Sequence, residues 1–299
     1  MPHHFILNPA AGGGRAGRAL PELRSALKQS KLEPVIHLTE RAGQAYEIAR
    51  GLPANEPVIA AGGDGTQHEI VGALLEGRAA SERPLGIIPL GTGDDFARGF
   101  GLPIGNLRAA LEVIVQGKLE TIDAGRLNGV PFINGIGSGF DAQCARAVLV
   151  APRLLPGSLR YLWAIVSELT RLEPRPARVE IDGQTVHDHS ALLVSIMNLT
   201  SYGGGLQIAP NASPTDGLLE VVVGGHFSKL DTLGILPKLQ KGTHIHHPEV
   251  QVFRGRTVRV EWFDLTAAHI DGELLEPTRT LEASIVPKAL RVFKNERKG

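Results

Sequence analysis

The amino-acid sequence predicts an α/β domain with a parallel sheet over residues 1–125, followed by a mainly antiparallel β-sandwich domain over residues 126–279. Two observations lead to this prediction. In the first part, short apolar runs alternate with segments of helical period, a pattern typical of strands joined by crossover helices. In the second part, two-residue turn sequences separate runs of β-type residues, a pattern typical of the hairpins of a sandwich.

Each apolar run of the first part is followed by a helical segment. We expect strands at residues 3–9, 33–40, 56–63 and 83–91, and helices at 15–30, 41–52, 66–77, 94–102 and 106–118. Right-handed crossovers make the strands of such a series parallel, and ligands then bind beyond their carboxyl ends. Glycine-rich turns at 12–14, 62–65 and 91–93 all follow strand ends. These turns are therefore predicted to meet at one edge of the sheet.

The second part is marked by turn dipeptides. Asn128-Gly129, Asp182-Gly183 and Asp271-Gly272 are favoured two-residue hairpin turns, because both positions tolerate positive φ. One helix is expected at 158–172, "SLRYLWAIVSELTRL", with an apolar stripe. The stripe consists of Leu159, Leu162, Trp163, Val166 and Leu169. Its simplest interpretation is a helix that packs on the core.

Composition excludes several classes of protein. Lys plus Arg and Asp plus Glu both total 31 in 299 residues, so the balanced charge argues against binding to nucleic acid. The single Cys144 cannot form an internal disulfide, which favours a reducing compartment. We see no signal-peptide pattern at the start and no apolar stretch of about 20 residues. A cytoplasmic location is expected.

The turn "GGDGT" raises a chemical question. Its glycines allow sharp turns that aim N–H groups into a concavity, and the helix that follows adds the positive end of its dipole, so the site suits phosphate. The carboxylate of Asp64 would repel phosphate unless a divalent cation or a transferable proton lay between them. Asp64 is therefore predicted to serve a magnesium site or to act as a base. The alternative is that Asp64 only caps the following helix.

Two companion loops have the same character. "PLGTGDDFAR" offers the hydroxyl of Thr92, the carboxylates of Asp94 and Asp95 and the cation of Arg98. "NPAAGGGRAGR" places Arg15 at the start of a helix, where a basic group can neutralise phosphate charge. Three loops of one kind at one sheet edge favour a nucleotide site over three unrelated turns.

The ordered motifs "NPAAG", "GGDGTQHE", "PLGTGDDFAR", "YGGGLQIAPNASPTDGLLEVVV" and "HIDGE" resemble the bacterial diacylglycerol kinase-like lipid kinases, a family that includes sphingosine and ceramide kinases. The resemblance extends from Asn8 to beyond Glu273. It implies an ATP-binding α/β domain, a β-sandwich domain and an active-site cleft between them. It also implies that residues 280–299 return to complete the first domain.

The same resemblance implies roles for individual residues. The expected nucleotide contacts are Asn8, Thr39, Gly62, Gly63, Asp64, Gly65, Thr66, Gln67, His68, Gly91 and Thr92. A magnesium site is implied at Ser213, Asp216 and Leu218, with backbone carbonyls as ligands at the non-acidic positions. Glu273 is the implied proton acceptor, with Asp271 beside it. Without the resemblance, "IDGELL" is interpreted only as a hairpin turn.

The implied reaction is ATP- and Mg²⁺-dependent phosphorylation of a hydroxyl on a lipid such as diacylglycerol or phosphatidylglycerol. Asp64 stays a rival to Glu273 as the general base. Transient contact with a membrane surface is expected, the helix at 158–172 is a candidate for binding acyl chains, and a homodimer is compatible with the sequence. Two alternatives stay open: an NAD kinase-like enzyme with a soluble substrate, and a nucleotide sensor without catalysis.

The sequence departs from the family pattern at two loops. Asp94 stands where the family commonly has Asn, which adds a negative charge near the expected nucleotide. The first loop has Ala11 and Gly14 where Ser and Lys are common, which leaves Arg15 as the available cation.

Overall fold

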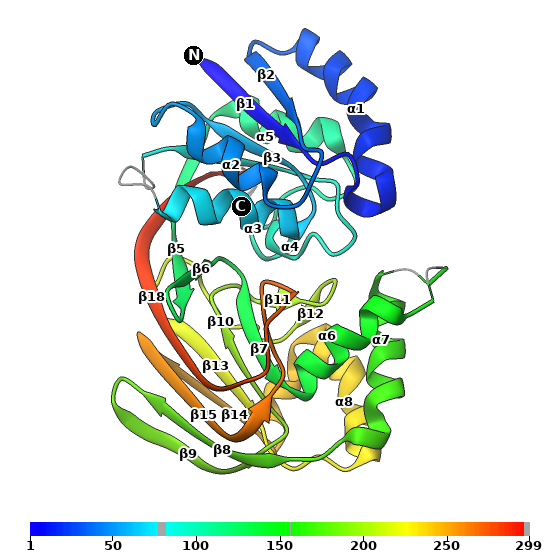
Figure 1. Ribbon diagram of the computed structural model, residues 1–299, viewed down its shortest axis with the longest axis vertical. Coiled ribbons are helices and arrows are strands. Elements are labelled where there is room, and N and C mark those ends of the chain that lie inside the picture. Colours follow the sequence, from blue (N-terminus) through cyan, green and yellow to red (C-terminus); the bar gives the residue numbers. More distant parts are fainter. Residues whose placement is uncertain (77–81, 153, 156, 296–299) are drawn as a thin grey trace. The chain divides into compact units, whose positions relative to one another are not determined.

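The computed structural model describes residues 1–76, 82–152, 154–155 and 157–295, and the chain folds into two compact units (Figure 1). Unit 1 comprises residues 1–124 and 287–299, and unit 2 comprises residues 125–286. In the part of the chain that the structure describes, no helix is both long and apolar enough to cross a membrane.

Unit 1 is built on a parallel sheet, as predicted. Its strands have the order β2-β1-β3-β4-β18: β2 Glu33–Leu38, β1 Pro2–Leu7, β3 Val58–Gly62, β4 Pro84–Pro89 and the end of β18 Thr278–Phe293. All residues of β3 and β4 are buried, because a parallel sheet is covered on both faces by its crossover helices. This explains why these strands appear in the sequence as unbroken apolar runs.

The helices of unit 1 follow the predicted series. They are α1 Ala11–Gln29, α2 Gln44–Gly51, α3 Asp64–Glu76, α4 Asp95–Gly99 and α5 Leu107–Gln116. Within α1, Gly12, Gly13 and Gly14 have φ values of 61°, 64° and 83°, so regular helix geometry begins only after them. Gly77, the expected last residue of the third helix, lies outside the described residues.

Unit 2 contains two antiparallel sheets. One has β5 Leu119–Leu127, β6 Val130–Phe132, β8 Arg175–Ile181, β9 Gln184–Ala191, β15 Thr257–Thr266 and the first part of β18. The other has the order β14-β13-β10-β7-β16-β17: Val250–Gly255, Leu219–Gly224, Leu193–Met197, Gly135–Gly139, Ala268–Ile270 and Glu273–Leu274. A short ladder joins β11 Ser201–Tyr202 to β12 Leu206–Gln207. The predicted sandwich is confirmed.

The three predicted hairpin turns all have the expected backbone. Asn128, Asp182 and Asp271 have φ values of 48°, 49° and 49°, and the glycine after each is also at positive φ. They join β5 to β6, β8 to β9 and β16 to β17. Positive φ at both central residues matches the right-handed twist of the strands, which explains the Asx-Gly sequences.

The core of the sandwich follows the two-residue period of its strands. Val194 and Ile196 of β10 point into it, as do Val221 and Val223 of β13, and they meet residues such as Val260 of β15. The intervening residues of β10 and β13 therefore point to the other face of the six-stranded sheet. That face is covered by helices.

Unit 2 has more helix than the sequence predicted. Besides α7 Gly157–Glu168 it contains α6 Phe140–Val150, α8 Lys229–Lys241 and the 3₁₀ turns η1 Leu169–Arg171 and η2 Thr243–His246. Helix α8 escaped the periodicity analysis because Gly234 and Pro237 interrupt it, although Ser228 and Asp231 form a capping box at its start.

The apolar stripe of α7 differs from the core-packing interpretation. Leu159, Leu162, Trp163 and Val166 are 36–49% exposed, whereas Ala164 and Ile165 are buried against α6 and its neighbours. The helix packs through Ala164 and Ile165 and leaves these four residues of the predicted stripe at the surface.

Candidate functional site

The three glycine-rich loops of unit 1 meet at the carboxyl edge of its parallel sheet. A Cβ atom on Gly91 would lie 2.4 Å from the Cα atom of Gly63, and one on Gly12 would lie 2.4 Å from the carbonyl oxygen of Leu90. Backbone therefore touches backbone where these loops cross, and only glycine fits. The predicted convergence is present in the structure, and it leaves a surface composed of main-chain groups.

Asp64 is the first residue of α3, and its carboxylate caps a second helix, α4. Its Oδ1 accepts hydrogen bonds from the backbone N–H groups of Asp95 at 2.8 Å and of Phe96 at 3.4 Å, at the start of α4. A Cβ on Gly93 would lie 2.9 Å from its Oδ2, so the carboxylate lies directly against the "GTGDD" turn. Asp64 thus ties the second glycine loop to the third.

The other predicted nucleotide residues surround these loops. Asn8 Oδ1 accepts from Ala10 N–H at 3.0 Å, and the buried Thr39 donates its N–H to Leu7 O at 2.9 Å. Glu69 accepts from the N–H groups of Gly43 and Ala45 at 2.9 and 3.0 Å, which fixes the turn that follows Thr39.

Within α3, Thr66 and Gln67 are buried and His68 is half-buried. Both polar atoms of the Gln67 side chain are buried and have no partner among the described residues. Thr92 is exposed at the top of its turn, beside the buried Gly91. Thr66 and Gln67 are thus buried beneath the loops, whereas Thr92 is exposed to solvent.

Asp94 and Arg15 form a pair in this loop cluster. The Asp94 side chain is buried, and the backbone of Asp94 has a φ of 51°. Its Oδ1 accepts a hydrogen bond from Gly91 N–H at 2.8 Å, and its Oδ2 lies 3.4 Å from Arg15 Nη2. Arg15 also donates to the carbonyl of Gly91. Burial raises the pKa of Asp94 from 3.8 to about 6, although the Gly91 N–H lowers it in part. Asp94, which stands where the family commonly has Asn, thus holds Arg15, the available cation of the first loop.

We expect Asp94→Asn to stabilise the protein at pH 7.5 by about 1–3 kcal/mol, because the variant avoids burying a charge. The folded protein binds this proton more tightly than the unfolded chain, so wild-type stability rises as pH falls through 6 toward 4. The advantage of the variant should therefore shrink between pH 7 and pH 5. Urea unfolding at several pH values measures this, and parallel pH profiles for the two proteins would contradict it.

In unit 2, Asp271 and Glu273 have different environments. The carboxylate of Asp271 accepts from the N–H groups of Ile133, Asn134 and Gly135 at 3.0, 2.8 and 3.0 Å. Glu273 is exposed, at the first position of β17. Asp271 therefore fixes the hairpin to the start of β7, and it holds in place the strand that carries Glu273.

Asp271→Ala is expected to lower the free energy of unfolding by about 2–4 kcal/mol, because three N–H groups lose a charged acceptor and alanine is strained at positive φ. Asp271→Asn should cost less, since asparagine tolerates this φ and keeps one carbonyl oxygen. Urea titration followed by tryptophan fluorescence tests the order. Equal stability of all three proteins would mean that these bonds do not hold the hairpin.

The loop before β13 contains the predicted metal residues. Leu218 N–H donates to Asp216 Oδ1 at 3.0 Å, and Ser213 Oγ lies 3.1 Å from Thr215 Oγ1. Hydroxyl, carboxylate and carbonyl oxygens in one turn suit a hard cation such as Mg²⁺. In the described residues no group of three or more His, Cys, Asp or Glu side chains could hold a metal, so a metal here would need backbone or hydroxyl oxygens beside the carboxylate of Asp216.

A buried polar cluster in unit 2 was missed by the sequence analysis. Asp141 Oδ2 accepts from Tyr202 Oη and lies 3.0 Å from His269 Nε2, while Ser195 Oγ lies 2.8 Å from Tyr202 Oη. A Cβ on Gly137 would lie 1.8 Å from Asp141 Oδ2, so this glycine makes room for the cluster. Polar residues inside apolar strands, as in "LVSIM" and "AHI", were the available signal.

Comparisons with known proteins agree with these observations. The family model for the diacylglycerol kinase catalytic domain matches residues 2–127, and the model for the YegS C-terminal NAD kinase beta sandwich-like domain matches residues 134–294. A diacylglycerol kinase of Mycobacterium tuberculosis is 36% identical over 297 residues, covering 97% of this chain and 94% of that one. One of Bacillus subtilis is 30% identical, covering 90% and 88%. A solved diacylglycerol kinase structure from Bacillus anthracis has the same fold, with a TM-score of 0.75 at 21% identity over 99% of this chain and 97% of that one.

Proposed function

The chain belongs to the diacylglycerol kinase family, and from this premise we propose that it transfers the γ-phosphoryl group of ATP to a hydroxyl of diacylglycerol or a closely related glycerolipid. The single observation that supports this best is the meeting of three glycine-rich loops around Asp64 at the carboxyl edge of a parallel sheet. Main-chain N–H groups and a helix N-terminus at this edge are the elements that bind phosphate.

The proposed nucleotide site consists of Gly62–Gly65 with the start of α3, flanked by Thr92 and Arg15. Glycine backbone lets a phosphate approach closely, and the guanidinium of Arg15 offsets its charge. Mg²⁺, when bound, neutralises charge on the phosphates. The magnesium site implied at Ser213, Asp216 and Leu218 would use the carboxylate of Asp216 and the backbone carbonyl oxygens of Ser213 and Leu218.

The proposed reaction needs a carboxylate to take a proton. The lipid hydroxyl oxygen attacks the γ-phosphorus, the bond to the β-phosphate oxygen breaks, ADP leaves, and the hydroxyl proton passes to the base. Glu273 supports this role because its side chain is exposed, whereas the carboxylate of Asp271 accepts from three N–H groups. Asp64 is the rival, because its carboxylate lies among the glycine-rich loops of the proposed nucleotide site.

The decisive experiment is an acceptor panel. Purified protein with ATP and Mg²⁺ is offered diacylglycerol, phosphatidylglycerol, a sphingoid base and NAD, and ADP release and the phosphorylated product are both measured. Phosphorylation of diacylglycerol alone, or of it and phosphatidylglycerol, supports the proposal. Transfer to NAD only would favour the NAD kinase-like alternative, and ATP binding with no transfer would favour a sensor.

A lipid substrate requires access to a membrane, and the exposed face of α7 supports such contact. Leu159, Leu162 and Trp163 offer apolar area of the kind that binds at the interface of a bilayer.

We expect the double change Leu159→Glu and Trp163→Glu to reduce co-sedimentation with phosphatidylglycerol vesicles at least fivefold while activity on a water-soluble short-chain diacylglycerol is retained. Leu230→Glu on α8, where the leucine is 80% exposed, is the control. Unchanged sedimentation of the double variant would rule out this contact.

A further inference from the structure

The hairpin that carries Glu273 is too short to hold its own position. Strand β16 has three residues and β17 has two, and β17 is the edge strand of the six-stranded sheet. A ladder this short adds little stability of its own, so the place of Glu273 depends on what else fixes the hairpin. Asp271 fixes the turn through three backbone N–H groups. The strands themselves need a further attachment.

His269 of β16 supplies this attachment, to helix α6. Its Nε2 atom lies 3.0 Å from Oδ2 of Asp141, the second residue of α6. In the ladder, His269 lies opposite Gly137 of β7 and Leu274 of β17. Glycine is required at 137, because a Cβ there would lie 2.3 Å from His269 Nε2. The contact thus joins α6 to the hairpin at the residue pair next to Glu273.

The carboxylate of Asp141 is the shared acceptor of this buried cluster. Tyr202 Oη donates to Asp141 Oδ2, and Ser195 Oγ lies 2.8 Å from Tyr202 Oη. Burial raises the pKa of Tyr202, and the carboxylate raises it further, so the hydroxyl keeps its proton. His269 Nε2 also donates, because a carboxylate only accepts. In the described part of the chain, the buried Nδ1 of His269 has no partner, so Nε2 makes the one hydrogen bond of the ring.

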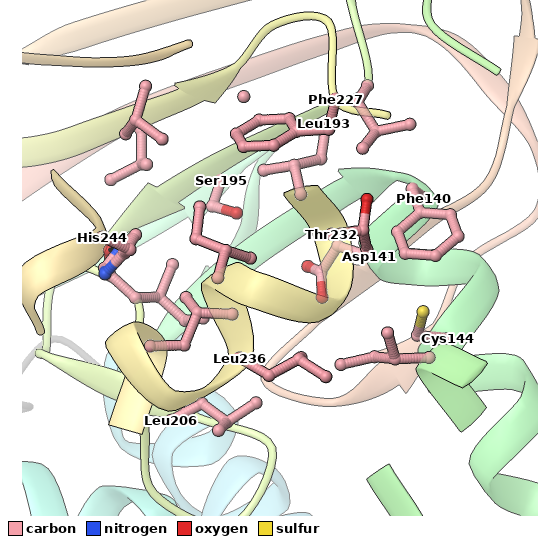
Figure 2. A pocket seen from close by; sticks show the side chains of 18 of the residues that line it. Phe140, Asp141, Cys144, Leu193, Ser195, Leu206, Phe227, Thr232, Leu236 and His244 are labelled. Carbon is pink, nitrogen blue, oxygen red and sulfur yellow. Dashed lines mark hydrogen bonds between the residues drawn. The ribbon is translucent and has the colours of Figure 1, made fainter. Parts of the chain in front are cut away.

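Apolar surroundings strengthen these bonds. All four side chains of the cluster are buried. Asp141 and Ser195 line a pocket, and most of the other side chains labelled around it are apolar (Figure 2). Away from water, a hydrogen bond to a carboxylate is stronger and its loss costs more. The ring of Tyr202 also packs edge-on against that of His269, with the ring centroids 5.2 Å apart. The cluster therefore fixes β16 firmly to α6.

We infer that Asp141 and His269 are positioning residues that set the place of Glu273, an inference that rests on the proposed kinase function. A general base must lie within hydrogen-bond reach of the hydroxyl, and a displacement of about 1 Å can cost about 100-fold in rate. Loss of the contact should therefore lower kcat. It should leave the KM for ATP unchanged, because the proposed nucleotide contacts belong to unit 1.

The test compares two buried histidines of unit 2. His269→Leu should lower kcat for a water-soluble diacylglycerol by about 10- to 100-fold, with the KM for ATP within about twofold of wild type. His187→Leu is the matched control, since His187 is buried in β9 of the other sheet and its Nδ1 lies 2.9 Å from Gln251 Oε1. It should lose stability but keep its kcat. His269→Gln retains an N–H donor for Asp141 and should recover about a third of wild-type kcat.

Amide hydrogen exchange measures the hairpin without catalysis. The amides of residues 268–274 should exchange about tenfold faster in His269→Leu than in wild type, and no faster in His187→Leu. If His269→Leu fails to fold, Tyr202→Phe serves instead, because it removes one donor to Asp141 and keeps the ring; exchange should then be about threefold faster.

The two readouts separate the inference from the kinase proposal. Faster exchange in His269→Leu, with no phosphorylation of any lipid by wild-type protein, would support the attachment of the hairpin while refuting the kinase proposal. Wild-type kcat in His269→Leu, or an equal loss of kcat in His187→Leu, would overturn the inference and leave the kinase proposal standing.

Discussion

Replacing Glu273 with glutamine is expected to lower kcat for diacylglycerol phosphorylation by about 10²–10⁴-fold, the range for removing a general base. The KM for ATP should change little, because the proposed nucleotide contacts lie elsewhere in the chain. Glu273 is exposed at the end of its hairpin, so glutamine should fold normally. Steady-state kinetics with a water-soluble diacylglycerol measures the effect, and Glu276→Gln, an exposed neighbour, is the matched control.

Asp64→Asn separates the two candidate bases. Asparagine retains a carbonyl oxygen to accept from Asp95 and Phe96, so the loops should stay in place while the charge is lost. If Asp64 serves the metal–nucleotide complex, the KM for ATP rises along with the fall in kcat. A loss in kcat for Asp64→Asn with no change in KM, together with an active Glu273→Gln, would instead assign the base to Asp64.

Gly91→Ala is expected to disrupt the loop cluster of unit 1. The new Cβ would meet the Cα of Gly63 at 2.4 Å and Asp94 Oδ1 at 2.7 Å, and backbone cannot yield as a flexible side chain does. We expect a loss of about 1–3 kcal/mol in the free energy of unfolding, as for overpacked cores. ATP affinity should fall at least tenfold, because the two phosphate loops are forced apart.

Urea unfolding and calorimetric titration with ATP measure both effects. Gly51→Ala is the matched control, since Gly51 lies at the end of α2 and a Cβ there meets nothing within 4 Å. That change should be neutral or slightly stabilising. Wild-type ATP affinity in Gly91→Ala would show that the contact between the two loops is not needed for the nucleotide.

The sequence predicted those turns and strands whose formation depends on residues next to one another in the chain. The turn at Asp182-Gly183 needs positive φ at two successive positions, and few residue pairs other than Asx-Gly supply it. The strand Val58–Gly62 is buried on both faces, and its continuous apolar run predicted such a covered strand. Helix α8 was missed because its apolar residues follow no clean period once Gly234 and Pro237 interrupt them.

Site residues that belong to contiguous motifs could be predicted from the sequence. Contacts between residues that are far apart in the chain could not. Gly63 and Gly91 were both chosen as site residues, but their contact follows only from the three-dimensional packing. Asp64 was expected to cap its own helix or to serve the phosphates, and the cap it makes on α4 depends on a loop 31 residues away. The link between Asp141 and His269 spans 128 residues, which no local pattern records.

The last strand has a consequence for how the protein is made. Strand β18 pairs with β15 in unit 2 through residues such as Val258 and Ala283, and its end pairs with β4 in unit 1 through Arg291 and Val292. The parallel sheet that carries the glycine loops therefore lacks an edge strand until residues 287–293 have left the ribosome. All of unit 2 is synthesised in between, so the N-terminal segment waits as an incomplete sheet with an open edge at β4. Nascent chains of this protein thus expose a pairing edge at β4 for most of translation, the kind of edge that promotes wrong strand pairing.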